Sequence, residues 1–268
     1  MEALKEGYIS RYEGQGPFVR GSWKSDSDRL FGPLQTVAVW QNLIDASLVP
    51  VLDTRLVFVS PTAAEPTHEL AIWQFERARQ RPKSHFLVGD IRQIDPNSTY
   101  PNLCFSTVLD EAGSCRRGAI GFQYFRWDAE RLPIAPGAVN VLWDRKGWLW
   151  HLANDIKDPQ RLWENFRRYH RILVKDGILV IDAIEGFDRS LTDGQRRKLH
   201  QMYEEFQKGE VEKYLPSDIF PDPPGQYEHS TVDLISKCDP DIWNKLPWLF
   251  AIKDVGEGVE KVRVLVKK

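Results

Sequence analysis

The chain has 268 residues, of which 42 % are hydrophobic and 28 % are charged. These proportions are ordinary for a globular protein, and they exclude a fibrous repeat or a wholly disordered chain. The 36 Lys and Arg residues against 38 Asp and Glu residues give a net charge of −2. This balance argues against a protein whose main role is to coat nucleic acid or an acidic membrane, although it leaves room for a local basic groove.

Membrane and metal signals are missing from the sequence. No apolar run approaches the roughly 20 residues of a membrane-spanning helix, and the first residues lack the pattern of a signal peptide. The three cysteines, Cys104, Cys115 and Cys238, and the six histidines share no metal-ligand spacing. We therefore expect a cytoplasmic protein with reduced cysteines, no metal site and no membrane partner. The sequence does not indicate an oligomeric state.

Strand-like and helix-like segments alternate along most of the chain. Residues 1–53 are predicted to form an N-terminal arm and a helix over 33–48, and one domain is predicted over 54–268, with insertions at about 95–118 and 187–230. The predicted strands are 55–60, 85–90, 119–125, 138–143 and 177–182, followed by a hairpin of 248–255 and 261–266. The predicted helices are 68–81, 158–173, 192–208 and one that begins at Thr231.

This alternation predicts an α/β fold with a mostly parallel sheet and helices on both of its faces. The continuous apolar run of the fifth predicted strand, 177–182, is typical of a strand that is covered on both faces. Gly177 is predicted to follow directly the end of the preceding helix. The hairpin at the end of the chain adds antiparallel strands to the sheet.

A dense block of motif-like residues lies between positions 122 and 184. Phe125-Arg-Trp-Asp128-Ala-Glu-Arg-Leu-Pro133 precedes the fourth predicted strand, and Tyr169-His-Arg171-Ile-Leu-Val-Lys175-Asp-Gly177 precedes the fifth. This block resembles the class I S-adenosylmethionine-dependent methyltransferases, and the likeness extends less densely over residues 54–268. The resemblance implies a Rossmann-like, mostly parallel seven-stranded sheet with helices on both faces and a C-terminal antiparallel hairpin.

The resemblance also implies where S-adenosylmethionine, the methyl donor, would bind. Asp128 and Ala129 hold the positions that meet the adenine ring in the family. Asp90 is the first candidate, and Asp95 the second, for the position of the acid that binds the ribose hydroxyls in the family. The residues that follow the fourth strand, beginning with Asp144, line the methyl-donor pocket. Asp128 has an alternative role as the cap of the turn that follows it.

The loop after the first predicted strand departs from the family. Members of the family have Gly-x-Gly-x-Gly here, so that the backbone can approach the cofactor closely. This chain has Ser60-Pro61-Thr62-Ala63-Ala64-Glu65-Pro66, with no glycine and with two prolines that lack an N–H group. Ser60 and Thr62 are the candidate cofactor contacts. The glycine-free loop supports an alternative, in which the protein is a non-catalytic, methyltransferase-like binding or regulatory protein with impaired cofactor binding.

Two residues near the end of the fourth predicted strand are candidate catalytic groups. Asp144 is placed to orient the substrate, position the donor or act as a general base, unless it pairs with Arg145 or Lys146. His151 is a candidate base, unless it is a structural residue at an apolar helix start. Many methyl transfers need little base catalysis, because in-line positioning of the reactive sulfonium supplies much of the rate.

The sequence therefore predicts an S-adenosylmethionine-dependent methyltransferase that transfers the methyl group by an SN2 reaction. The balanced charge favours a small-molecule acceptor over a nucleic acid. A nicotinamide-dependent enzyme is disfavoured because no Gly-x-Gly-x-x-Gly motif is present. The segment 187–230 is either a solvated charged helix or a substrate cover. If the fold is correct, Trp127 and at least one of Trp148 and Trp150 lie near the carboxyl edge of the sheet.

Overall fold

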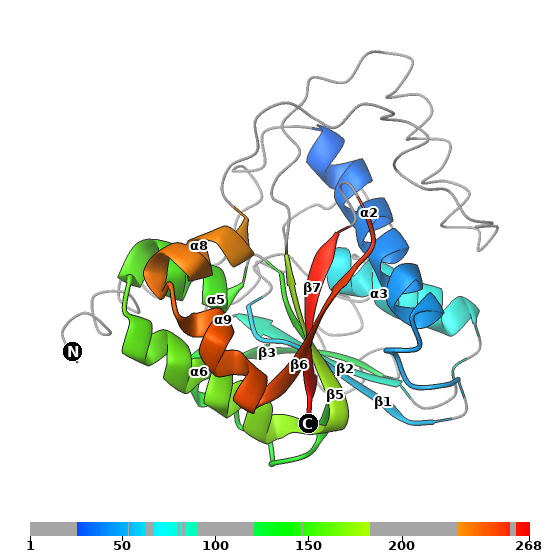
Figure 1. Ribbon diagram of the computed structural model, residues 1–268. Helices are drawn as coiled ribbons and strands as arrows, with labels where there is room; N and C mark the ends of the chain where they lie inside the picture. Colours follow the sequence, from blue (N-terminus) through cyan, green and yellow to red (C-terminus); the bar gives the residue numbers. More distant parts are fainter. Residues whose placement is uncertain are drawn as a thin grey trace.

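The described part of the chain forms one seven-stranded sheet (Figure 1). The computed structural model describes residues 26–52, 54–62, 67–79, 81, 84–90, 121–145, 147–182, 230–257 and 261–268. The strands are β1 (Leu56–Ser60), β2 (Ser84–Asp90), β3 (Phe122–Arg126), β4 (Val139–Asp144), β5 (Leu173–Asp182), β6 (Phe250–Val255) and β7 (Val262–Lys267). Their order is β3-β2-β1-β4-β5-β7-β6. Strands β1 to β5 are parallel, and β7 is antiparallel to both of its neighbours.

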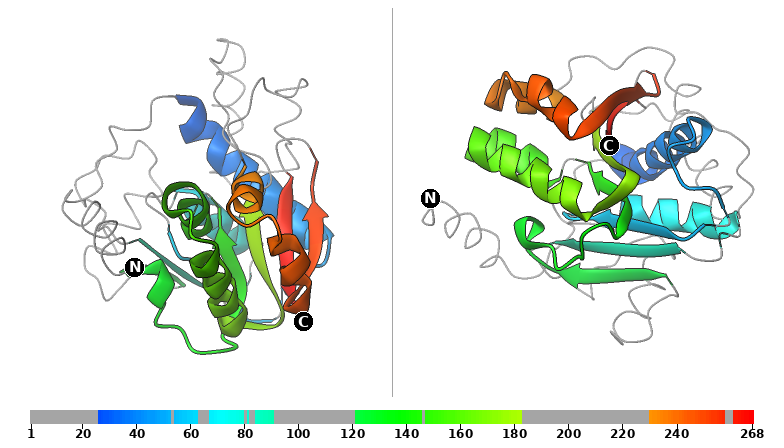
Figure 2. Two further views of the ribbon diagram at one scale, coloured as in Figure 1. Left: turned by 60° about the vertical axis from the view of Figure 1, so that its left-hand side comes forward. Right: turned by 60° about the horizontal axis from the view of Figure 1, so that its bottom comes forward.

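Helices cover both faces of this sheet (Figures 1 and 2). One face carries α2 (Asp26–Asp45) and α3 (Thr67–Ala78), and the other carries α5 (Trp148–His151), α6 (Pro159–Ile172), α8 (Thr231–Cys238) and α9 (Ile242–Lys245). Shorter turns are η2 (Ala129–Arg131), the π-helical η3 (Leu152–Ile156) and η5 (Leu246–Trp248). The predicted fold class is confirmed: a Rossmann-like, mostly parallel sheet with a C-terminal antiparallel hairpin. Of the predicted arm, residues 26–32 are described and are helical, as part of α2, so this stretch was predicted wrongly. The rest of the arm, the helix 192–208 and both insertions lie outside the described residues, apart from residue 230.

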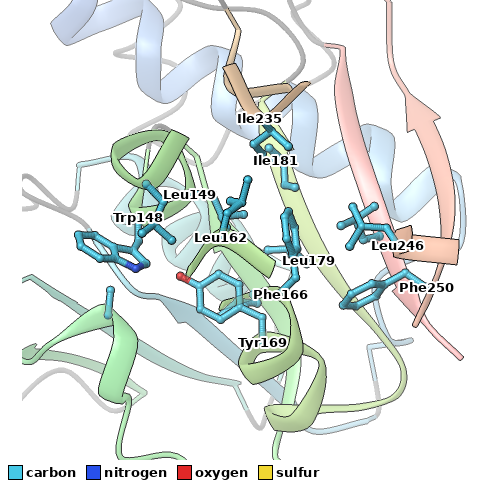
Figure 3. Packing of buried hydrophobic residues seen from close by; sticks show 14 of the residues in the cluster. Trp148, Leu149, Leu162, Phe166, Tyr169, Leu179, Ile181, Ile235, Leu246 and Phe250 are labelled. Carbon is cyan, nitrogen blue, oxygen red and sulfur yellow. The ribbon is translucent and has the colours of Figure 1, made fainter. Parts of the chain in front are cut away.

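Two apolar layers hold the helices to the sheet. Under α2, the indole of Trp40 meets the rings of Phe58 and Trp143 edge-on, at centroid distances of 5.8 and 6.2 Å. On the other face, α6 packs Phe166 among strand residues such as Leu179 (Figure 3). The two sets come from alternate positions of the strands, because successive side chains of a strand point to opposite faces. Helix α2 therefore belongs to the same core as the strands that follow it.

The junction between α6 and β5 differs from its prediction. Helix α6 ends at Ile172 and β5 begins at the next residue, so Gly177 lies within the strand and does not follow the helix end. A Cβ atom at Gly177 would lie 2.9 Å from the carbonyl oxygen of Val174 and 3.0 Å from that of Val139. Glycine is therefore required here by the close approach of neighbouring backbone. The residue with a positive φ, of 61°, is Asp176.

The other boundaries agree with the predictions to within a few residues, with the largest difference at α2, which begins at Asp26 instead of residue 33. Strand β3 begins at Phe122 instead of residue 119. None of the helices in the described ranges combines the length and the apolar character that crossing a bilayer requires.

Candidate functional site

The strand order reverses between β1 and β4. Starting from β1, the chain adds β2 and β3 on one side and then returns to place β4 on the other side. In open α/β sheets, ligands bind beyond the carboxyl ends of the strands at such a switch point. The residues at this point are Ser60, which ends β1, and Asp144, which ends β4. Both are candidates from the sequence, so the topology places the predicted site where the fold favours one.

The carboxyl group of Asp144 is completely buried. Its Oδ2 atom accepts a hydrogen bond from the backbone N–H of Leu149 at 3.2 Å, whereas Oδ1 has no hydrogen-bond donor among the described residues. Burial raises the pKa of this carboxyl group from 3.8 to about 7. The Tyr169 hydroxyl and the Leu149 N–H group lower the pKa by smaller amounts, and the charge of Asp182 raises it further.

The backbone of Gly147 packs closely against Asp144 and Thr62. A Cβ atom at this position would lie 1.9 Å from Asp144 Oδ1 and 2.5 Å from the hydroxyl oxygen of Thr62. The Thr62 hydroxyl is buried and has no partner in the described structure. A carboxylate from β4 and a hydroxyl from the loop after β1 therefore converge on one point, and both retain hydrogen-bonding capacity there.

A second buried acid, Glu69, lies in the first turn of α3. Its Oε1 atom accepts a hydrogen bond from the Ser60 hydroxyl at 2.9 Å, while no described donor reaches Oε2. Burial raises the pKa of Glu69 to about 7, although its own backbone N–H group, the Ser60 hydroxyl and the charge of Arg145 each lower it. Sequence reasoning missed Glu69. The available signal is an acid in the first turn of the helix after β1, where the helix dipole favours negative charge.

Arg145 ties this edge of the sheet to helix α2. Its guanidinium group donates to Asp182 Oδ1, to the Thr36 hydroxyl and to Gln35 Oε1, each at 2.7 Å. Arg145 therefore pairs with the acid at the end of β5 and not with Asp144. Sequence reasoning also missed Asp182, which ends the apolar strand β5 just as Asp144 ends β4.

Trp127 covers the carboxyl ends of β1 and β2, as predicted. Its indole N–H donates to the carbonyl oxygen of Pro61 at 2.9 Å, and a Cβ atom at Gly89 would lie 2.6 Å from the same ring. Trp148 begins α5, beside the Leu149 N–H group that binds Asp144. The predicted placement of these two tryptophans at the carboxyl edge is confirmed.

The residues predicted to meet the adenosine part follow β2 and β3. Asp128 Oδ1 accepts the backbone N–H of Glu130 at 2.9 Å, so this carboxylate caps η2. Its second oxygen has no partner among the described residues and is open to a ligand. Ala129 is buried beside it. Asp90 is the last residue of β2, opposite Arg126 of β3; its side chain lies outside the described atoms.

His151 takes part in a local helix contact. Its Nδ1 atom lies 2.9 Å from Asp155 Oδ2, one helical turn further along the chain. Its ring also meets Trp150 edge-on at a centroid distance of 5.1 Å. These contacts agree with a structural role for His151, which is the alternative to its predicted role as a base.

The chemistry of the converging groups fits S-adenosylmethionine. Asp144 Oδ1 and Glu69 Oε2 are buried acceptors without described donors, and such atoms carry a desolvation cost until a donor or a cation reaches them. S-adenosylmethionine has both an ammonium group and a sulfonium centre. Thr62 Oγ1 can donate to its carboxylate. Within the described ranges, no cluster of three or more His, Cys, Asp and Glu side chains is arranged to hold a metal ion.

Comparison with models of protein families and with curated protein sequences gives no match. Among solved structures, a Methanococcus maripaludis protein provisionally assigned as an S-adenosyl-L-methionine-dependent methyltransferase has a TM-score of 0.45 and 13 % identity, over 90 % of this chain and 88 % of that chain. The CMeT domain structure of citrinin polyketide synthase has a TM-score of 0.45 and 12 % identity, over 87 % of this chain and 52 % of that chain. The [4+2]-cyclase SpnF has a TM-score of 0.37 and 14 % identity, over 95 % of this chain and 83 % of that chain. Further structures found in this comparison are described as methyltransferases, among them S-adenosylmethionine-dependent enzymes from Listeria monocytogenes and Aquifex aeolicus, and what this chain shares with them is the fold.

Proposed function

We propose that the chain is an S-adenosylmethionine-dependent methyltransferase that acts on a small-molecule acceptor. One observation carries the proposal. At the switch point between β1 and β4, the buried acids Asp144 and Glu69 each hold an oxygen that no described donor satisfies. A buried acceptor left in this state costs roughly 1–3 kcal/mol, so the site favours a ligand that brings positive charge or donors. The methionine end of S-adenosylmethionine has both.

When bound, S-adenosylmethionine supplies a methyl carbon made electrophilic by its sulfonium centre, and SN2 attack by the acceptor releases S-adenosylhomocysteine. The residues of this chain bind and orient the methyl donor. Asp144 holds the positive methionine end through Oδ1, and Thr62 donates to the carboxylate of the same moiety. Trp127 covers the edge of the sheet and excludes water from it. Asp128, through the oxygen that does not cap η2, and the backbone of Ala129 bind the adenine ring.

A second candidate function is a methyltransferase-like module that binds a partner or regulates it without transferring a methyl group. The Ser60 hydroxyl favours this candidate, because it is buried and donates to Glu69 instead of standing open to a ligand. Together with the prolines of the glycine-free loop, this contact leaves fewer donors for a cofactor at β1.

Titration of the full chain with S-adenosylmethionine and with S-adenosylhomocysteine tests the proposal by calorimetry. We expect both compounds to bind, because the adenosine contacts are common to both. Absence of binding at millimolar concentration would overturn the enzyme assignment. Binding that persists while labelled methyl groups reach no acceptor in a screen of small molecules would favour the non-catalytic module.

Substitution of Asp128 tests the position of the adenine ring. Asp128→Asn keeps an oxygen to cap η2, since Asn caps helices as well as Asp, but it places an N–H₂ group where the second carboxylate oxygen was. We expect the affinity for S-adenosylmethionine to fall by about 1–3 kcal/mol while the melting temperature stays unchanged. The matched control is Asp158→Asn, at the residue that caps α6 by accepting the N–H of Arg161. Equal affinities of the two variants would show that the adenine ring binds elsewhere.

A further inference from the structure

A basic groove lies along α6, on the side of the helix that faces η2. Its volume is about 680 Å³, and its walls come from residues 129–132, from Glu164, from residues 167–172 and from Leu249. Arg171, near the end of α6, lines the groove. The backbone carbonyl of Arg171 accepts the N–H of Gly137 in the turn that enters β4. The part of the groove at Arg171 is thus near the amino end of β4, whereas Asp144 is at the carboxyl end of the same strand.

The acids of the groove are already paired. Glu130 accepts a hydrogen bond from Arg161 Nε at 2.5 Å, and Glu164 lies 3.6 Å from Arg168. Three further arginines, Arg131, Arg167 and Arg171, line the groove. No acid among the described residues pairs with any of the three, so the groove carries an excess of positive charge.

Arginines in the last turns of a helix often serve to satisfy its free carbonyl groups. That role does not account for these three. The carbonyl oxygens of Tyr169, Arg171 and Ile172 already accept backbone N–H groups, from Leu173, Gly137 and Ala138 respectively. The guanidinium groups of the groove are therefore available to a ligand.

One wall of the groove is uncharged. The ring of His170 meets Phe250 edge-on at a centroid distance of 5.2 Å, and its partial burial and the neighbouring Lys267 lower its pKa. The imidazole is therefore neutral at physiological pH and offers one donor and one acceptor. Leu132 and Leu249 add apolar surface to the same groove.

We propose that this groove binds a small molecule that carries at least two phosphate groups. Its volume falls within the range of roughly 300–1,000 Å³ that is typical of small-ligand sites. The planar fork of a guanidinium group matches two oxygens of a phosphate, and several arginines on one groove suit linked phosphates better than a single anion. The groove shares Ala129 with the proposed adenine contacts, but none of its arginines belongs to those contacts, and the proposal stands whether or not the chain transfers methyl groups.

Calorimetric titration of the full chain with inorganic pyrophosphate and tripolyphosphate at low ionic strength tests this site. We expect both probes to bind, with the affinity falling as salt is added. In Arg167→Gln/Arg171→Gln, we expect the affinity for both probes to fall by about tenfold or more, because two charge-assisted contacts are lost. The control is Arg55→Gln/Lys253→Gln, which removes the same charge at exposed positions outside the groove.

The outcomes separate the groove from general electrostatic attraction. A change of less than about twofold in the control pair, with the expected loss in the groove pair, supports the proposal. Equal losses in both pairs, or no binding of either probe by the unmodified chain, overturn it. Tighter binding of a single-stranded oligonucleotide than of tripolyphosphate also overturns it, because the ligand class is then wrong. If the double variant does not fold, Arg167→Gln alone carries the test.

Discussion

Asp144→Asn is expected to make the protein more stable at alkaline pH and to weaken the dependence of its stability on pH. The folded pKa of Asp144 is raised from 3.8 to about 7. Between these two values the folded chain holds a proton that the unfolded chain has released, so stability falls as pH rises through this window and stays low above it. For one such carboxyl group, we expect the loss at pH 8 to be on the order of 2–4 kcal/mol.

Urea denaturation of the unmodified chain and of Asp144→Asn at several values between pH 5 and pH 8 measures this effect. Glu69 has the same raised pKa, so the variant retains part of the slope. Asp254→Asn is the control: the hydrogen bond from Arg263 lowers the pKa of Asp254 from its ordinary value of 3.8, so its contribution changes only below the measured range and the slope between pH 5 and pH 8 should stay unchanged. A stability profile that is the same in Asp144→Asn and the unmodified chain would show that Asp144 is not desolvated. If Asp144 holds the positive end of the cofactor, this variant also binds S-adenosylmethionine more weakly.

Glu76→Ala is expected to lower the free energy of unfolding by about 3–5 kcal/mol, the usual cost of removing one partner of a buried ion pair. Glu76 is completely buried at the end of α3. It accepts hydrogen bonds from Trp40 Nε1 at 2.7 Å and from Arg79 at 3.2 Å, and it also pairs with Arg81. The guanidinium group of Arg81 in addition donates to three backbone carbonyls of residues 50–54. Loss of Glu76 leaves a buried cation and a buried indole N–H group without their acceptor.

The matched control is Glu164→Ala, which removes the acid of a half-exposed pair with Arg168 in α6. Pairs of this kind contribute at most about 1 kcal/mol, so the control should unfold almost like the unmodified chain. Glu76→Gln keeps the shape and an acceptor oxygen, and it is expected to give an intermediate loss. A loss below about 1 kcal/mol in Glu76→Ala would mean that water solvates this cluster.

Most of the fold was predictable from the sequence, because the strands are short apolar runs bounded by turns and α6 has a regular apolar face. Helix α6 also has clear end signals in Asp158 and Pro159. The short helical turns between residues 152 and 156 and between 242 and 248 were not predicted, since segments of three to five residues have too few turns to show a period. Gly177 was misplaced because a glycine needed for close backbone approach looks the same in sequence as one that ends a helix.

The site residues that directly follow a strand could be predicted from the sequence. Asp144 and Thr62 were found because the family resemblance assigns ligand contacts to the residues after the fourth and first strands, and the structure brings the two together around Gly147. Glu69 and Asp182 were missed, because a single acid next to an apolar segment usually faces solvent and only the fold shows that these two are buried. The ligand contacts themselves remain predictions.

The packing of Trp40 has a consequence for folding during synthesis. Its principal ring partner on β4, Trp143, is made about a hundred residues later, and Phe58 alone is available earlier. Helix α2 leaves the ribosome before the strand that completes its packing surface, so the Trp40 indole lacks part of its packing until β4 has been added. Contacts of such long range slow folding and lengthen the exposure of apolar surface. The early part of this chain is therefore where a chaperone that holds nascent polypeptides has most to protect.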